Sequence, residues 1–160
     1  MPRGARILLD NVCYHIINRG NQKQKIFLED FDFERYLQFL KHFKKKYGFK
    51  VFGYCLMPNH IHLILDPKQP VELARIMQGI TQTYTAWFNK KYKKAGHLWQ
   101  GRFKSMVIQK DKYFIECVYY IEANPVRAGL VSSPIDYIWS SYRDRVFGTK
   151  KGLLDFPDST

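Results

Sequence analysis

The sequence predicts an α+β fold, in which an antiparallel sheet carries helices on one face and leaves the other face free for a ligand. Segments rich in β-branched and aromatic residues alternate with two long segments of helical apolar spacing. A turn signal, Met57-Pro58-Asn59, separates two neighbouring apolar segments and predicts a hairpin. Two long helices that connect strands of one sheet are typical of the split βαβ, ferredoxin-like arrangement.

The expected elements follow in the order strand, helix, strand, strand, helix, strand, helix. Asp30 or Asp32 could cap the first helix, and Gly48 ends it. Asp111 is a plausible cap for the third helix, which ends before Pro125 because the residue before a proline avoids the helical region. The expected ranges are 11–18, 28–47, 49–56, 60–65, 71–92, 103–109 and 112–123.

The size and charge of the chain indicate one domain with a polyanionic partner. The 160 residues fit a single domain over residues 1–160, with a basic C-terminal segment from about residue 127. Lys and Arg number 26 against 14 Asp and Glu, so the formal net charge is +12. Together with 16% aromatic residues, this is typical of proteins that bind phosphates and stack on unpaired bases. A basic enzyme without a nucleic-acid partner is the alternative.

The cysteine pattern and the hydropathy favour a cytoplasmic protein that does not enter a membrane. Cys13, Cys55 and Cys117 are far apart in apolar surroundings, which does not suggest a disulfide framework. No apolar run approaches the roughly 18 residues of a membrane span. The first residues also lack the apolar core of a signal peptide.

Two histidines follow the predicted hairpin turn. His60 and His62 are two residues apart in a strand, so both side chains face the side opposite Ile61. Two imidazoles on one face of a rigid strand form half of a metal site. Alternatively, His60 caps a turn and His62 forms a hydrogen bond with a neighbouring strand. The choice depends on whether another segment supplies a third ligand and a reactive group.

The third predicted helix offers both groups. Tyr120 and Asn124 are four residues apart and share a helical face. A tyrosine oxygen can act as a covalent nucleophile, although the hydroxyl is mostly protonated at neutral pH. A divalent cation held by His60, His62 and Asn124 would polarise a scissile phosphate for in-line attack. This ligand set favours Mg²⁺ or Mn²⁺ over structural zinc. Taken alone, Tyr120 could be an ordinary half-buried aromatic residue, and Asn124 part of a helix stop.

Two loops carry cations that could follow a phosphate backbone. The loop at residues 19–25 could lie along phosphates or be an ordinary solvated turn. In the loop at residues 96–105, Trp99 could stack on an unpaired base or close the core. From charge, aromatic character and loop position, the expected DNA contacts are Arg19, Lys23, Trp99, Arg102, Lys104 and Arg127.

Five segments, in order along most of the chain, match the motifs of a known family. They are residues 14–20 (YHIINRG), 54–63 (YCLMPNHIHL), 98–105 (LWQGRFKS), 120–131 (YIEANPVRAGLV) and 139–143 (WSSYR). On these segments the chain resembles the REP-associated tyrosine transposases, a branch of the single-tyrosine HUH transposases. The resemblance implies an HUH nuclease fold. It also implies metal-dependent cleavage and strand transfer of single-stranded DNA, used in DNA transposition and recombination.

The resemblance also assigns roles to individual residues. It implies that Tyr120 becomes linked to a 5′ phosphate and leaves a free 3′ hydroxyl, while His60, His62 and Asn124 bind Mg²⁺ or Mn²⁺. In the related insertion-sequence transposases the helix ligand is usually Gln, and those proteins are dimers that exchange the tyrosine helix. Asn124 and the extended C-terminal segment favour the REP-associated branch, which tends to act as a monomer beside palindromic hairpins; a dimer stays possible.

Two other functions use the same residues differently. A non-catalytic nucleic-acid-binding module of the same fold would share the charge and the aromatic residues. A metal-dependent hydrolase that activates water would share the histidines but would not need Tyr120. Only the combination of His60, His62, Tyr120 and Asn124 favours the DNA-cleaving enzyme.

Overall fold

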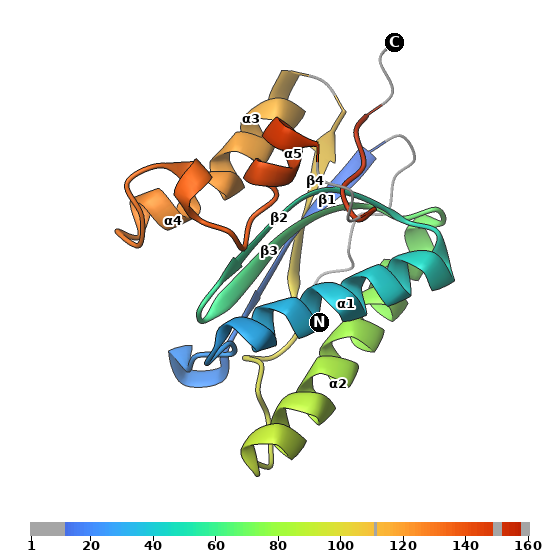
Figure 1. Ribbon diagram of the computed structural model, residues 1–160. Coiled ribbons are helices and arrows are strands. Elements are labelled where there is room, and N and C mark those ends of the chain that lie inside the picture. Colours follow the sequence, from blue (N-terminus) through green and yellow to red (C-terminus); the bar gives the residue numbers. More distant parts are fainter. Residues whose placement is uncertain (1–11, 111, 149–151, 158–160) are drawn as a thin grey trace.

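The four strands form one antiparallel sheet in the order β2-β3-β1-β4, which confirms the ferredoxin-like topology (Figure 1). The computed structural model describes residues 12–110, 112–148 and 152–157. Asn11, the expected start of the first strand, and Asp111, the expected cap of the third helix, lie outside these ranges. The strands are β1 (Val12–Arg19), β2 (Lys50–Met57), β3 (His60–Asp66) and β4 (Lys104–Gln109).

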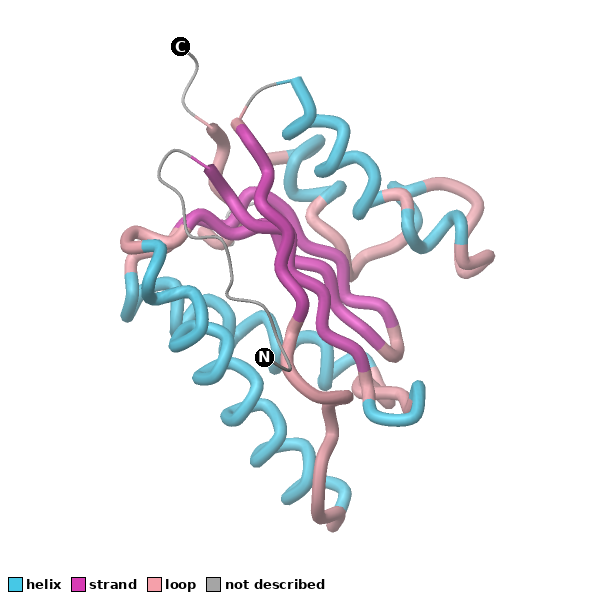
Figure 2. Tube along the Cα trace, turned by 180° about the vertical axis from the view of Figure 1, so that it is seen from behind, coloured by secondary structure: helices cyan, strands magenta, loops and turns pink. Residues whose placement is uncertain are grey.

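Two long helices cover one face of the sheet, and three other helices lie on the opposite side (Figures 1 and 2). No helix in the described ranges is long and apolar enough to cross a membrane. The first face carries α1 (Asp30–Tyr47) and α2 (Leu73–Tyr92); the opposite side carries α3 (Lys112–Glu122), α4 (Asn124–Arg127) and α5 (Tyr142–Phe147). Single helical turns are η1 (Asn21–Lys23), η2 (Pro70–Glu72) and η3 (Pro134–Asp136).

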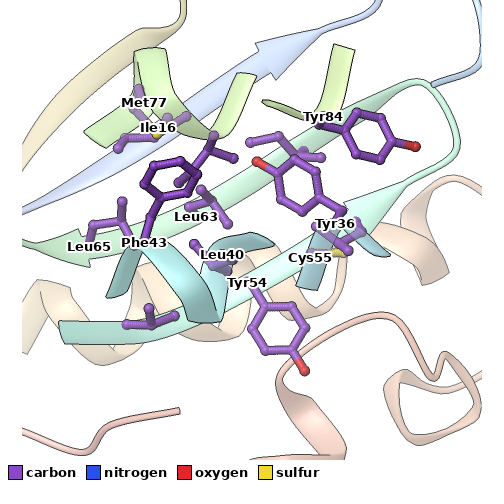
Figure 3. Close-up of a cluster of buried hydrophobic side chains, with 14 of the residues drawn as sticks. Ile16, Tyr36, Leu40, Phe43, Tyr54, Cys55, Leu63, Leu65, Met77 and Tyr84 are labelled. Carbon is purple, nitrogen blue, oxygen red and sulfur yellow. The ribbon is translucent and has the colours of Figure 1, made fainter. Parts of the chain in front are cut away.

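The main core lies between the sheet and the two long helices. Because side chains alternate along a strand, Ile61, Leu63 and Leu65 of β3 all point to this side, and all three are fully buried. They belong to the same apolar cluster as Leu40 of α1 and Met77 of α2 (Figure 3). The intervening residues of β3, which include both histidines, therefore point to the opposite face.

The sequence predicted that the opposite face of the sheet is free for a ligand. In the structure that face is covered as well. Its strands present apolar side chains there, and these would be exposed to water if no helix covered them. The helix α3 packs on this face and completes a second, smaller apolar cluster. The cluster consists of Cys13, Phe52, Ile64 and Ile108 from the strands, and Phe114, Val118 and Ile121 from α3.

A buried carboxylate joins the start of α1 to the end of α2. Asp32 accepts the backbone N–H groups of Leu28 and Glu29 at 2.8 and 3.2 Å. It also accepts Lys91 Nζ at 2.6 Å and the Tyr92 hydroxyl at 2.5 Å. The side chain of Asp32 is completely buried, so each of these donors replaces a water contact that the carboxylate has lost.

Replacing this carboxylate should destabilise the fold. We expect Asp32→Asn to lower the free energy of unfolding at pH 7 by about 2–3 kcal/mol, because charged hydrogen bonds are lost inside the protein. The measurement is urea unfolding followed by circular dichroism. As a control, Glu29→Gln should change stability by less than about 1 kcal/mol, since Glu29 is an exposed partner of the same lysine.

The loss caused by Asp32→Asn should depend on pH. Burial alone raises the pKa of Asp32, but hydrogen bonds from Lys91 and Tyr92 outweigh burial and hold that pKa below its ordinary value. A carboxylate with a lowered pKa stabilises the fold above its unfolded pKa of about 4, and this contribution disappears as the pH falls through the folded pKa. A loss of stability that stayed equal from pH 7 to pH 2.5 would contradict this account.

Candidate active site

Both histidines of β3 turn one ring nitrogen toward the same side chain. His60 Nε2 and His62 Nε2 lie 3.2 and 2.9 Å from Nδ2 of Asn124, the first residue of α4. His62 is buried, whereas His60 and Asn124 are half-buried. The structure thus brings the three expected metal ligands together, although the strand and the helix that carry them are far apart in sequence.

The other nitrogen of each histidine ring is also engaged. His60 Nδ1 lies 2.8 Å from Asn59 Oδ1, which can only accept, so this nitrogen carries the proton. His62 Nδ1 lies 2.9 Å from Nε2 of His15. Because His62 Nε2 accepts from the Asn124 amide, its Nδ1–H donates to His15. Both Nε2 lone pairs therefore point at Asn124.

His15 lies within the motif at residues 14–20 but is not among the site residues expected from the sequence. The β1–β3 register pairs His62 with Ile17, two residues after His15, so His15 lies on the same face of the sheet. It is 5% exposed, and its ring stacks on His62 with centroids 5.1 Å apart. In the sequence, the even spacing of His15 from Arg19 indicates only that the two side chains share a face of one strand. That this is also the face of His60 and His62 follows from the strand register.

Burial keeps these imidazoles neutral. It lowers the pKa of His60 to about 4, with help from the charge of Arg19. It lowers the pKa of His62 to about 3, with smaller contributions led by His15, and the pKa of His15 to about 4. At neutral pH each ring is therefore uncharged and carries a single proton, so His60 and His62 can offer their Nε2 lone pairs to a cation.

The donor spacing fits a divalent cation. Among the described residues, no group of three His, Cys, Asp or Glu side chains could hold a metal, so the candidate set is two imidazoles and one amide. An octahedral cation with ligands at about 2.1 Å places neighbouring ligands about 3 Å apart. The observed 2.9 and 3.2 Å agree with this spacing. A half-turn of the Asn124 amide would bring Oδ1 to the place of Nδ2 and supply the third donor.

Tyr120 lies near the end of α3 and is 57% exposed. The guanidinium of Arg127 lies 3.9 Å from the centre of the Tyr120 ring and donates to the Tyr120 carbonyl oxygen at 2.8 Å. The helix α3 ends at Glu122, close to the expected end at residue 123, and after a break at Ala123 the short helix α4 begins at Asn124, with Pro125 in its first turn. This break places a cation directly over the tyrosine ring.

The expected DNA contacts form two groups. Arg19 pairs with His60, and Lys104 pairs with Ile17, which itself pairs with His62, so both cations stand on the face of the histidines. Arg127 completes this first group above Tyr120.

The second group includes Trp99 and Arg102, which line a cleft between α2 and the loop that precedes β4. This cleft has a volume of about 860 Å³. Trp99 is 9% exposed, and its indole N–H donates to Thr85 Oγ1 at 2.9 Å, which favours the core role that the sequence left open. Lys23 is exposed in η1.

Comparisons with known proteins agree with this fold. A family model described as "Transposase IS200 like" matches residues 9–124. A protein of Haemophilus influenzae named as a REP-associated tyrosine transposase is 32% identical over 107 residues, which cover 60% of this chain and 60% of that protein.

Two solved structures share the fold. A REP-associated tyrosine transposase bound to a REP hairpin superposes with a TM-score of 0.74 at 19% identity, over 99% of this chain and 100% of the other. A protein of Deinococcus radiodurans described as a transposase gives a TM-score of 0.50 at 17% identity, over 75% of this chain and 95% of the other. Because the family model spans most of the sequence, this chain belongs to the family of IS200-like transposases, and its resemblance to the REP-associated tyrosine transposases is confirmed.

Proposed function

We propose that this protein is a transposase that cleaves and rejoins single-stranded DNA through a covalent bond between Tyr120 and a 5′ phosphate. The observation that carries the proposal is the convergence of His60 Nε2 and His62 Nε2 on Asn124, four residues after an exposed tyrosine. A module that only bound nucleic acid would have no need for two neutral imidazoles aimed at a common point.

The reaction would exchange one phosphate ester for another. The Tyr120 oxygen would attack the phosphorus in line with the 3′ oxygen; the Tyr120 O–P bond forms, the P–O3′ bond breaks, the phenol proton passes to solvent, and the 3′ oxygen takes up a proton. Arg127 would orient the ring, and its guanidinium could bind a phosphate oxygen. Mg²⁺ or Mn²⁺ bound by His60, His62 and Asn124 would supply Lewis-acid polarisation of the scissile phosphate.

We further propose that the substrate is unpaired DNA beside a hairpin, bound by one copy of the chain. The solved relative was bound to a REP hairpin, and the cations Arg19, Lys104 and Arg127 surround the candidate site here. Asn124 reaches His60 and His62 of its own chain, so the proposed ligand set needs no residue from a second copy. Cys13 and Cys55 are buried free thiols, consistent with a reducing cytoplasm.

The identity of the nucleophile can be tested with two adjacent tyrosines. Tyr119 and Tyr120 are similarly exposed, at 56% and 57%, but only Tyr120 lies under the Arg127 guanidinium. Tyr120→Phe should abolish the covalent protein–DNA adduct and all nicking, and leave hairpin affinity within about twofold, because affinity depends on cations. Tyr119→Phe should still form the adduct. The measurement is a denaturing gel with labelled hairpin DNA and Mn²⁺. Nicking by Tyr120→Phe without an adduct would favour an activated-water hydrolase.

The metal site can be tested without measuring cleavage. His60→Ala should remove Mn²⁺ binding, as followed by electron paramagnetic resonance, and a chelator should stop adduct formation while DNA binding survives. His15→Phe should weaken Mn²⁺ binding by about 10- to 100-fold, because His62 loses the acceptor that orients its ring. His15→Gln retains an acceptor and should lose less. Wild-type Mn²⁺ affinity in His60→Ala would refute the assignment.

The substrate class predicts a strong preference for unpaired DNA. Unpairing a duplex costs a few kcal/mol, so a fully paired version of the same sequence should be cleaved far more slowly. Hairpin affinity should fall steeply with salt, and Lys104→Ala should reduce the slope of log K against log salt by about 1. Lys45→Ala, on the outside of α1, is the matched control and should leave the slope unchanged. Equal cleavage of paired and unpaired DNA would contradict the proposed substrate.

A further inference from the structure

The outer edge of β2 is occupied by the C-terminal part of the chain. β2 is an edge strand, so the peptide groups on its outer side have no partner in the sheet. Residues 137–145, which we call the C-terminal clamp, bind these groups. Leu56 N–H donates to the Trp139 carbonyl at 2.8 Å, and the Leu56 carbonyl accepts the Tyr137 hydroxyl at 2.5 Å. Ser141 N–H donates to the Tyr54 carbonyl at 2.9 Å.

The same clamp holds the end of α3. Glu122, the last residue of α3, is 1% exposed, and its carboxylate accepts hydrogen bonds from two clamp residues. The Ser141 hydroxyl donates to Glu122 Oε2 at 2.5 Å, and Arg145 Nη2 donates to the same oxygen at 2.8 Å. Arg145 Nη2 also donates to the Phe52 carbonyl of β2 at 2.9 Å. Arg145 therefore connects the end of α3, the helix that carries Tyr120, to the sheet.

The apolar contacts of α3 determine the position of this helix end less firmly. The apolar contacts of α3 with the sheet end at Ile121, and they are non-directional. The outer face of α3 is exposed at Ile115, Tyr119 and Tyr120. After Glu122 the helical path is interrupted at Ala123, before Asn124. Glu122 thus adds a directional anchor to β2 and the clamp, at a position between Tyr120 and Asn124.

We propose that Ser141 and Arg145 are positioning residues for the reaction: through Glu122 they determine where Tyr120 and Asn124 stand relative to the histidines of β3. This inference rests on the proposed function. The family model ends at Asn124, so it covers Glu122 but neither Ser141 nor Arg145. Loss of the clamp should slow the chemical step and leave DNA affinity unchanged, because neither residue belongs to the groups of expected DNA contacts.

The test compares three variants of the full chain. Arg145→Met leaves the carboxylate of Glu122 buried without its cation. The double variant Glu122→Gln with Arg145→Met removes both charges, and a neutral pair of this kind is often tolerated in stability. Lys44→Met is the matched control, since Lys44 forms another ion pair with the C-terminal part of the chain, at 2.6 Å to Asp155, and that pair does not involve α3.

Besides hairpin affinity, two quantities are measured on each variant: the rate of adduct formation at saturating hairpin DNA, and amide hydrogen exchange resolved by segment. Both Arg145 variants should form the adduct at least about tenfold more slowly with unchanged hairpin affinity, which corresponds to about 1.4 kcal/mol in the barrier. Exchange should accelerate in residues 113–123 while β1 and β3 stay protected. Lys44→Met should match the wild type in both measurements.

Three results would overturn the inference. These are a wild-type adduct rate in both Arg145 variants, exchange in α3 that does not change, or exchange that accelerates equally in the sheet, which would show a general loss of stability. Failure of the proposed function is a separate result. If the wild type forms no adduct, the proposed chemistry is wrong, whereas exchange confined to α3 in the Arg145 variants would still support the anchoring role of the clamp.

Discussion

The pairing register between β1 and β3 determines which chemistry each face of the sheet carries. In this register Arg19 pairs with His60, and Asn18 pairs with Ile61. A slip of one residue would turn every side chain of β3 to the other face, with the histidines in the apolar core and Leu63 outside it. Burial of the apolar side chains of β3 against α1 and α2 therefore holds the register. The apolar packing on one face of β3 therefore also sets the position of the histidines on the other face.

Most of the fold could be predicted from the sequence because its signals are local. The helical spacing in α1 and α2, the Pro58 turn and the alternation around His60 and His62 give the element order directly. The layering could not be predicted, since nothing local shows that Ile108 and Ile64 need a cover supplied by α3. His15 was missed for the same reason, because its contact with His62 depends on pairing between distant strands.

The sequence could identify the candidate nucleophile and metal ligands. It could not identify the residues that hold them in position. Tyr120, His60, His62 and Asn124 stand within recognisable motifs, and the structure brings both histidines and Asn124 together. The roles of Glu122 and Arg145 depend on a buried ion pair between segments that are distant in sequence. The C-terminal segment gave few regular signals, because it is ordered by hydrogen bonds to a strand edge rather than by its own periodicity.

The coverage of β2 by residues 137–145 also bears on how copies of this protein behave toward one another. An edge strand with unpaired peptide groups can add a strand from a neighbouring molecule, which begins sheet-to-sheet aggregation. Tyr54 and Leu56 have their outward peptide groups already bonded within the chain. The other edge, β4, is short and begins at Lys104, whose charge repels a like-charged copy. Both edges of the sheet thus carry features that oppose strand pairing between copies of this basic protein.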